Sequence, residues 1–128
     1  MSGHLHFSSP QSWHRQLADA IEAARPQRRC ILVQVGRLSC GGSRALVEKA
    51  VAKDEILEYL AAHYECVSAD ADAPEPRVAE LIERMPQRER TPYCLFLDAE
   101  GRFLHSTAGG RPAAVFLADL IQAQALAR

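Results

Sequence analysis

The run Cys30-Ile-Leu-Val-Gln-Val35 constrains the fold more than any other part of the 128-residue chain. It is short, rich in β-branched residues and almost continuously apolar. A strand with one solvated face would instead alternate apolar and polar residues. We therefore expect a strand that is covered on both faces, as in a sheet that packs between two layers of helices.

The other apolar segments predict helices and strands in alternation. Helices are expected over residues 10–24, from about residue 43 to 63 with a break near 53–55, around 78–82, and after Pro112. Strands are expected over residues 64–69, 93–97 and 102–107. This order predicts a parallel crossover unit followed by a hairpin and a closing helix. The fold class is then α/β, with a central mixed sheet of four to five strands flanked by helices on both faces. One domain over residues 10–128, preceded by a flexible tail over 1–9, fits the chain length.

Local signals set several element ends. Ser9-Pro10 is typical of a helix start, and Arg25-Pro26 ends that helix because proline disfavours the α conformation of the residue before it. Trp13 falls on the apolar face of this helix and is expected in the core. The sequence Asp98-Ala-Glu-Gly101 predicts a hairpin turn whose glycine takes a positive φ.

Charge and composition exclude several classes of function. The formal charge is −1, with 15 basic and 16 acidic residues, so neither nucleic acid nor an anionic membrane is an expected partner. No apolar run approaches the ~20 residues of a membrane span, and the N-terminus shows no secretory signal. We therefore expect a cytoplasmic protein without a membrane-spanning segment.

The four cysteines are Cys30, Cys40, Cys66 and Cys94. They are too scattered for a disulfide scaffold and lack Cys-x-x-Cys or zinc-ligand spacing, so neither a metal nor another cofactor is expected. Cys30 and Cys66 start strands and are interpreted as small core residues.

Cys40 differs from the others because it lies where a helix is expected to begin, in Cys40-Gly41-Gly42-Ser43. Unpaired backbone N–H groups and the helix dipole stabilise a thiolate there, which lowers the pKa of the thiol below ~8.5. Gly41 and Gly42 leave the sulfur accessible and allow a substrate backbone to approach.

This order of elements, with a Cys-Gly turn after the first strand, resembles the thioredoxin superfamily, and most closely its thiol:disulfide interchange branch. The resemblance rests on Ile31-Leu-Val-Gln-Val35 leading to Cys40, on Thr91-Pro92 before a strand, on Phe96-Leu-Asp-Ala-Glu-Gly101, and on Gly109-Gly110 before the last helix. It implies a thioredoxin-like fold and a cis proline at Pro92. Thr91 and Pro92 would then border Cys40 and bind an extended substrate by strand addition.

Three departures from that family change the expected chemistry. Ser43 stands where the family has its second catalytic cysteine, Ser39 where it has tryptophan, and Gln34 where many members have a buried acid. Ser43 is a hydrogen-bonding neighbour of Cys40 and cannot release a mixed disulfide, so an external thiol is needed. The sequence thus predicts a monothiol redox protein that acts on protein thiols and disulfides or on glutathione.

Two alternatives stay open. In the first, the chain is a redox-inactive thioredoxin-like module that binds a protein partner through the Cys40 and Pro92 surface. In the second, it is a relative of the monothiol glutaredoxins; this alternative has less support because Gly42 differs from the motif of that family. Cys94 is either a resolving thiol or a buried structural cysteine, and strand alternation favours the buried position. Asp70, Asp72 and Glu75 are interpreted as turn and helix-cap residues.

Overall fold

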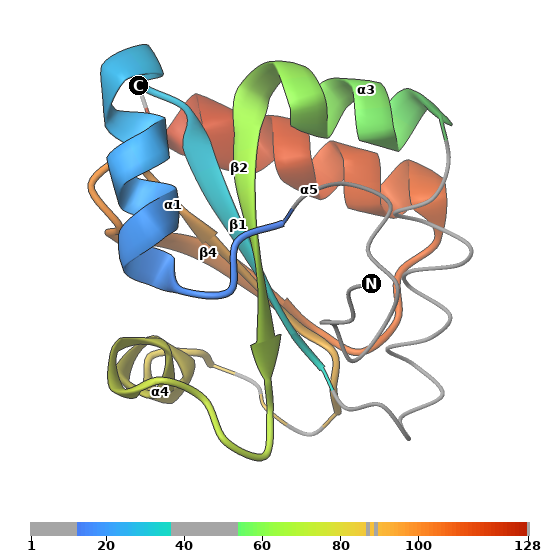
Figure 1. The fold of residues 1–128 in the computed structure, drawn as a ribbon. Coiled ribbons are helices and arrows are strands. Elements are labelled where there is room, and N and C mark those ends of the chain that lie inside the picture. Colours follow the sequence, from blue (N-terminus) through green and yellow to red (C-terminus); the bar gives the residue numbers. More distant parts are fainter. Residues whose placement is uncertain (1–12, 37–53, 87, 89, 128) are drawn as a thin grey trace.

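The computed structural model describes residues 13–36, 54–86, 88 and 90–127. Within these ranges a four-stranded sheet has the order β2-β1-β3-β4, and helices lie on both of its faces (Figure 1). The strands are β1 (Cys30–Gly36), β2 (Tyr64–Asp70), β3 (Tyr93–Leu97) and β4 (Phe103–Ala108). The helices are α1 (Leu17–Ala24), the 3₁₀ helix η2 (Arg25–Gln27), α3 (Asp54–His63), α4 (Pro76–Glu83) and α5 (Ala113–Leu126).

The sheet is mixed, as predicted. β1 pairs with β2 in parallel, from Cys30 opposite Tyr64 onward, and it pairs with β3 in the antiparallel sense. β3 and β4 form the predicted hairpin, which contains an irregularity between Phe96 and Leu97. The expected fold class, α/β with a mixed sheet between helical layers, is confirmed.

β1 is buried along its whole length, which explains its continuous apolar sequence. Its alternate side chains enter two separate cores. Leu32 packs with residues of α3 and α5 on one face, including Leu60 and Phe116. Ile31 packs with residues of α1 and α4 on the other, including Leu17. The covering of both faces is therefore what the sequence of β1 indicated.

The start of the first helix differs from the prediction. α1 begins at Leu17, whereas His14 forms a parallel bridge with Val67 of β2. The His14 N–H donates to the Cys66 carbonyl at 2.8 Å, and the His14 carbonyl accepts from the Ser68 N–H at 2.9 Å. Trp13 is buried as expected, but it belongs to the α3 and α5 core and not to the core beneath α1. Backbone pairing with the edge strand outweighs helix formation at these residues.

An acidic side chain from a distant loop caps α1. The N-cap residue of α1, Gln16, makes no side-chain capping bond, and the Leu17 N–H donates to the Glu75 carboxylate at 3.0 Å. Glu75 is the N-cap residue of α4, but its side chain makes no capping bond to that helix. The carboxylate instead lies at the positive end of the α1 dipole, where it joins α1 to the loop before α4.

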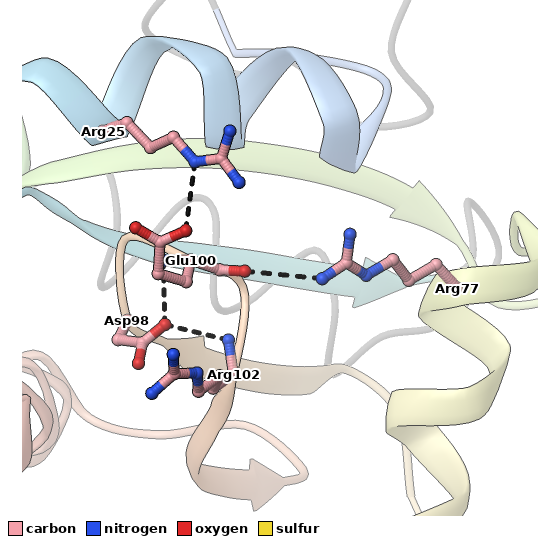
Figure 2. A network of polar contacts seen from close by, with 5 residues as sticks. All are labelled: Arg25, Arg77, Asp98, Glu100 and Arg102. Carbon is pink, nitrogen blue, oxygen red and sulfur yellow. Dashed lines mark hydrogen bonds and ion pairs between the residues drawn. The ribbon is translucent and has the colours of Figure 1, made fainter.

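The β3–β4 turn forms as predicted, with Gly101 at φ +85°. One Asp98 carboxylate oxygen accepts the Glu100 and Arg102 N–H groups, both at 2.9 Å. Figure 2 shows Arg25 and Arg77 reaching Glu100 from two different helical segments. The turn is thereby fastened to both helices of the α1 and α4 layer.

Candidate functional site

The predicted motif of Cys40, Gly41, Gly42 and Ser43 lies outside the described residues. The structure places the strand that leads to this motif, because β1 ends at Gly36. The end of the sheet at Gly36 is therefore where the candidate site begins, and the neighbouring strands determine what surrounds it.

The Thr91–Pro92 segment lies at this same end of the sheet. Val35 of β1 is opposite Tyr93 of β3, so the two residues before β3 are next to the end of β1. The Thr91–Pro92 peptide bond is cis. The Pro92 carbonyl accepts the Gly109 N–H at 2.9 Å and is thus engaged within the fold.

A row of four polar side chains crosses the sheet next to the Val35–Tyr93 pair. Ser68 is opposite Gln34, Gln34 is opposite Cys94, and Cys94 is opposite Thr107. Residues opposite one another in a sheet point to the same face, and this row shares its face with Leu32 and with α3 and α5. We call these four residues the polar row, and all of them are buried.

The polar row was not predicted, since it exists only once the strand register is known. Its clearest signal in the sequence is Gln34, the single polar side chain of the apolar strand β1. Among the residues that the structure describes, both amide atoms of Gln34 and the Ser68 hydroxyl are buried without a hydrogen-bond partner. Such groups are rare in folded proteins because their burial carries a desolvation cost. Departures of this kind from the usual pairing of buried polar groups are expected at functional sites.

Gln34 stands where the resemblance places a buried acid, and its side chain is fully buried. A carboxylate at this position would act as a proton acceptor. The amide of Gln34 is neutral and does not titrate, so it supplies hydrogen bonds but no base. A thiol that ionises at this end of the sheet therefore cannot transfer its proton to the side chain of Gln34.

Cys94 lies in the polar row and is fully buried. Burial raises the pKa of its thiol to about 12; nearby Asp119 also raises this pKa, while the Thr107 hydroxyl and Arg111 oppose the rise. Because the thiolate is the reactive form, a buried thiol with this pKa is a poor nucleophile at neutral pH. The packing thus matches the structural alternative for Cys94 better than the resolving one.

The other two described cysteines are also core thiols. Burial raises the pKa of Cys66, with a further contribution from Glu65. Burial and the Asp98 carboxylate raise the pKa of Cys30. Each of the three described cysteines therefore resists ionisation.

A buried ion pair fixes the segment that follows β4. The Arg111 Nε and Nη2 groups donate to the two Asp119 carboxylate oxygens at 3.0 and 3.1 Å. His105 Nε2 lies 3.8 Å from the same carboxylate, and the His105 ring packs on Phe96. The pair ties the loop carrying Gly109, and through it Pro92, to α5. The sequence analysis did not predict this pair. Its signal was Asp119 itself, the one charged residue of a helix that otherwise carries apolar residues and glutamines.

The described part of the chain contains neither a candidate metal site nor a candidate membrane-spanning helix. Within it, no group of three or more His, Cys, Asp or Glu side chains is arranged to hold a metal ion. No helix there has both the length and the apolar character to cross a membrane.

Solved structures share this architecture. The chain is similar to a DsbH oxidoreductase at 18% identity and a TM-score of 0.69, covering 98% of this chain and 92% of that one. A thioredoxin from Thermus thermophilus has 22% identity and a TM-score of 0.70, covering 88% and 87%. A putative disulphide isomerase from Bacteroides thetaiotaomicron has 16% identity and a TM-score of 0.72, covering 91% and 94%. These likenesses concern the fold.

No curated protein sequence matches the chain. A family model described as thioredoxin-like matches residues 12–99. The match runs from the segment before α1 through β1, β2 and β3 to the start of the hairpin turn. With this match and the mixed sheet described above, the chain belongs to the thioredoxin-like family.

Proposed function

We propose that the protein exchanges thiols and disulfides through Cys40 alone and that an external thiol completes each cycle. The observation that carries the proposal is the position of the motif. Cys40 follows the buried strand β1, whose end lies beside Thr91–Pro92 of the neighbouring strand. A thiol at a helix start in this position is expected to ionise more readily than a free cysteine.

The proposed cycle has two exchange steps. The Cys40 thiolate attacks one sulfur of a disulfide, a mixed disulfide forms on Cys40, and the other sulfur leaves as a thiolate. A second thiolate, from glutathione or a protein, then attacks the substrate sulfur of the mixed disulfide, forms a new disulfide with it and releases Cys40 as the thiolate. The electrons come from that external thiol, because Ser43 cannot attack a disulfide.

The packing of the other cysteines supports the need for an external thiol. Cys94 is the described cysteine closest to the end of β1 in the sheet register, opposite Gln34. It is fully buried, with a pKa of about 12. Resolution within the chain would require this thiol to leave the core.

Mass spectrometry of the intact, reduced protein treated with glutathione disulfide at neutral pH tests the proposal. We expect one glutathione per chain, located on Cys40 and removed by added glutathione. The Cys40→Ser variant keeps the three core cysteines and should form no adduct. Equal labelling of this variant, or no labelling of the native protein, would contradict the proposal.

A second function, the redox-inactive binding module, is favoured by Gln34. A buried neutral amide in place of an acid removes the proton acceptor expected beneath a dithiol site. In that case partners bind the Cys40 and Pro92 surface without covalent chemistry. Partner affinity measured by calorimetry would then be the same for the native protein and for Cys40→Ser, whereas covalent capture predicts its loss.

A further inference from the structure

A hollow of about 500 Å³ lies between α4 and the start of β4, and its lining includes neither the end of β1 nor the Thr91–Pro92 segment. Its lining is mostly charged: Arg77, Glu80, Leu81, Arg84, Gly101, Arg102 and Phe103. A volume of this size lies within the range of small-molecule sites, roughly 300–1,000 Å³. We call it the arginine hollow.

The helical spacing explains the charge of one wall. Arg77, Glu80, Leu81 and Arg84 follow one another at intervals that place them on a single face of α4 and its C-terminal cap. Leu81 is buried beneath this face. The side chains of Arg77 and Arg84 therefore belong to the same wall of the hollow, with Glu80 between them in the sequence.

The opposite wall comes from the hairpin turn. Arg102 is exposed and follows Gly101, while Phe103 presents its ring to Arg84, whose guanidinium carbon lies 5.8 Å from the ring centre. A Cβ atom on Gly101 would lie 2.8 Å from Arg77 Nη2. The glycine, already at positive φ, is what allows the Arg77 guanidinium to lie against the turn.

The three arginines of the hollow have unused binding capacity. Arg77 donates one long bond, 3.4 Å, to the Glu100 carbonyl. The Arg84 guanidinium lies over the Phe103 ring. In the part of the chain that the structure describes, no carboxylate forms an ion pair with Arg77, Arg84 or Arg102. By contrast, Arg25 pairs with Glu100 at 3.1 Å and Arg29 pairs with Glu65 at 3.2 Å.

We propose that the arginine hollow binds a small molecule with at least two oxyanion groups, either phosphates or carboxylates. A guanidinium offers a rigid fork of N–H donors that matches both groups. Arg77 and Arg84 start about 10 Å apart along the helix axis, at about 1.5 Å per residue, so a ligand with two anionic groups can place one at each guanidinium. Because of Glu80 the lining is not purely cationic, and this carboxylate can accept a bond from a ligand hydroxyl or amine.

Calorimetric titration of the native protein at constant ionic strength tests the proposal, with pyrophosphate and citrate as separate probes. We expect saturable binding of at least one probe, and chloride should give none. Binding of pyrophosphate alone identifies phosphate ligands, and binding of citrate alone identifies carboxylates. No saturable heat with either probe would overturn the proposal.

Substitutions distinguish binding by specific arginines of the hollow from attraction by the positive charge of the surface as a whole. Arg84→Gln and Arg102→Gln should each weaken binding by roughly 10-fold or more, the size expected when a charged hydrogen bond is lost. Arg84→Lys keeps the charge but loses the fork, and should give a smaller loss. Arg88→Gln is the matched control, because Arg88 is exposed and lines a different hollow.

Equal weakening by Arg84→Gln and Arg88→Gln would show that only net charge attracts the probe, which overturns the proposal. Circular dichroism verifies that each variant is folded. The titration does not involve Cys40. A failure of the proposed thiol exchange therefore says nothing about anion binding in the arginine hollow, and a failure of anion binding says nothing about the thiol exchange.

Discussion

Removal of the Arg111 guanidinium is expected to destabilise the protein strongly, because it leaves a carboxylate buried without its partner. The Asp119 side chain is 8% exposed, and Arg111 donates two hydrogen bonds to it, at 3.0 and 3.1 Å. In Arg111→Met the apolar part of the side chain is kept and the charge is lost. Of the described residues, His105 also lies near this carboxylate: its Nε2 is 3.8 Å from Asp119, and it carries charge only when protonated.

The size of the effect follows from the burial of each partner. Breaking a fully buried pair costs about 3–5 kcal/mol. The Arg111 side chain is 32% exposed, so water already screens part of this interaction and partly solvates Asp119 after the substitution. We therefore expect a loss of about 2–3 kcal/mol in the free energy of unfolding. For a domain of this size that corresponds to a decrease in Tm of roughly 6–15 °C.

Urea unfolding followed by circular dichroism measures the change, with a constant slope showing that the unfolded state is unaltered. The double variant Arg111→Met with Asp119→Leu should recover much of the loss, because neither charge remains buried. Arg25→Met is the matched control: it breaks the exposed Arg25–Glu100 pair and should change stability by less than about 0.5 kcal/mol. If Arg111→Met costs no more than Arg25→Met, or if the double variant is as unstable as the single one, the reasoning fails.

Three further substitutions test the core and the cap. Gln34→Leu removes two buried amide atoms that have no hydrogen-bond partner in the described part of the chain, and should raise the free energy of unfolding by about 1 kcal/mol in urea titrations; a decrease would show that the amide is satisfied in solution. Glu75→Gln weakens the charged cap on the Leu17 N–H, so a loss of about 0.5–1 kcal/mol is expected, reduced by added salt. The Cys94 thiol has its pKa raised by burial from 9.0 to about 12. Its contribution to stability is therefore complete below pH 9 and is lost as the pH rises toward 12, since only the unfolded thiol ionises in that range. Cys94→Ala should flatten this part of the stability profile, and an unchanged profile would contradict the burial of the thiol.

The pattern of apolar residues determined the sheet and most of its helices. The sequence of β1 required covering on both faces because almost every residue in it is apolar, and the two cores provide that covering. The β3–β4 turn was equally predictable, since Asp98 and Gly101 have local preferences that do not depend on the rest of the chain. Periodicity and turn chemistry act over a few residues, and a sequence shows them directly.

Contacts between distant residues were decided by the tertiary structure. The strand-like pairing of His14 replaced a helix that local periodicity favoured, because β2 offered backbone partners. The Glu75 cap on α1, the Arg111–Asp119 pair and the polar row depend on strand register and on how helices pack. For Cys40 and Ser43 the sequence alone provides the chemical argument, since they lie outside the described residues. The sequence therefore determines which groups the chain carries, and register and packing decide which of them meet, because those contacts join residues that have no local influence on one another.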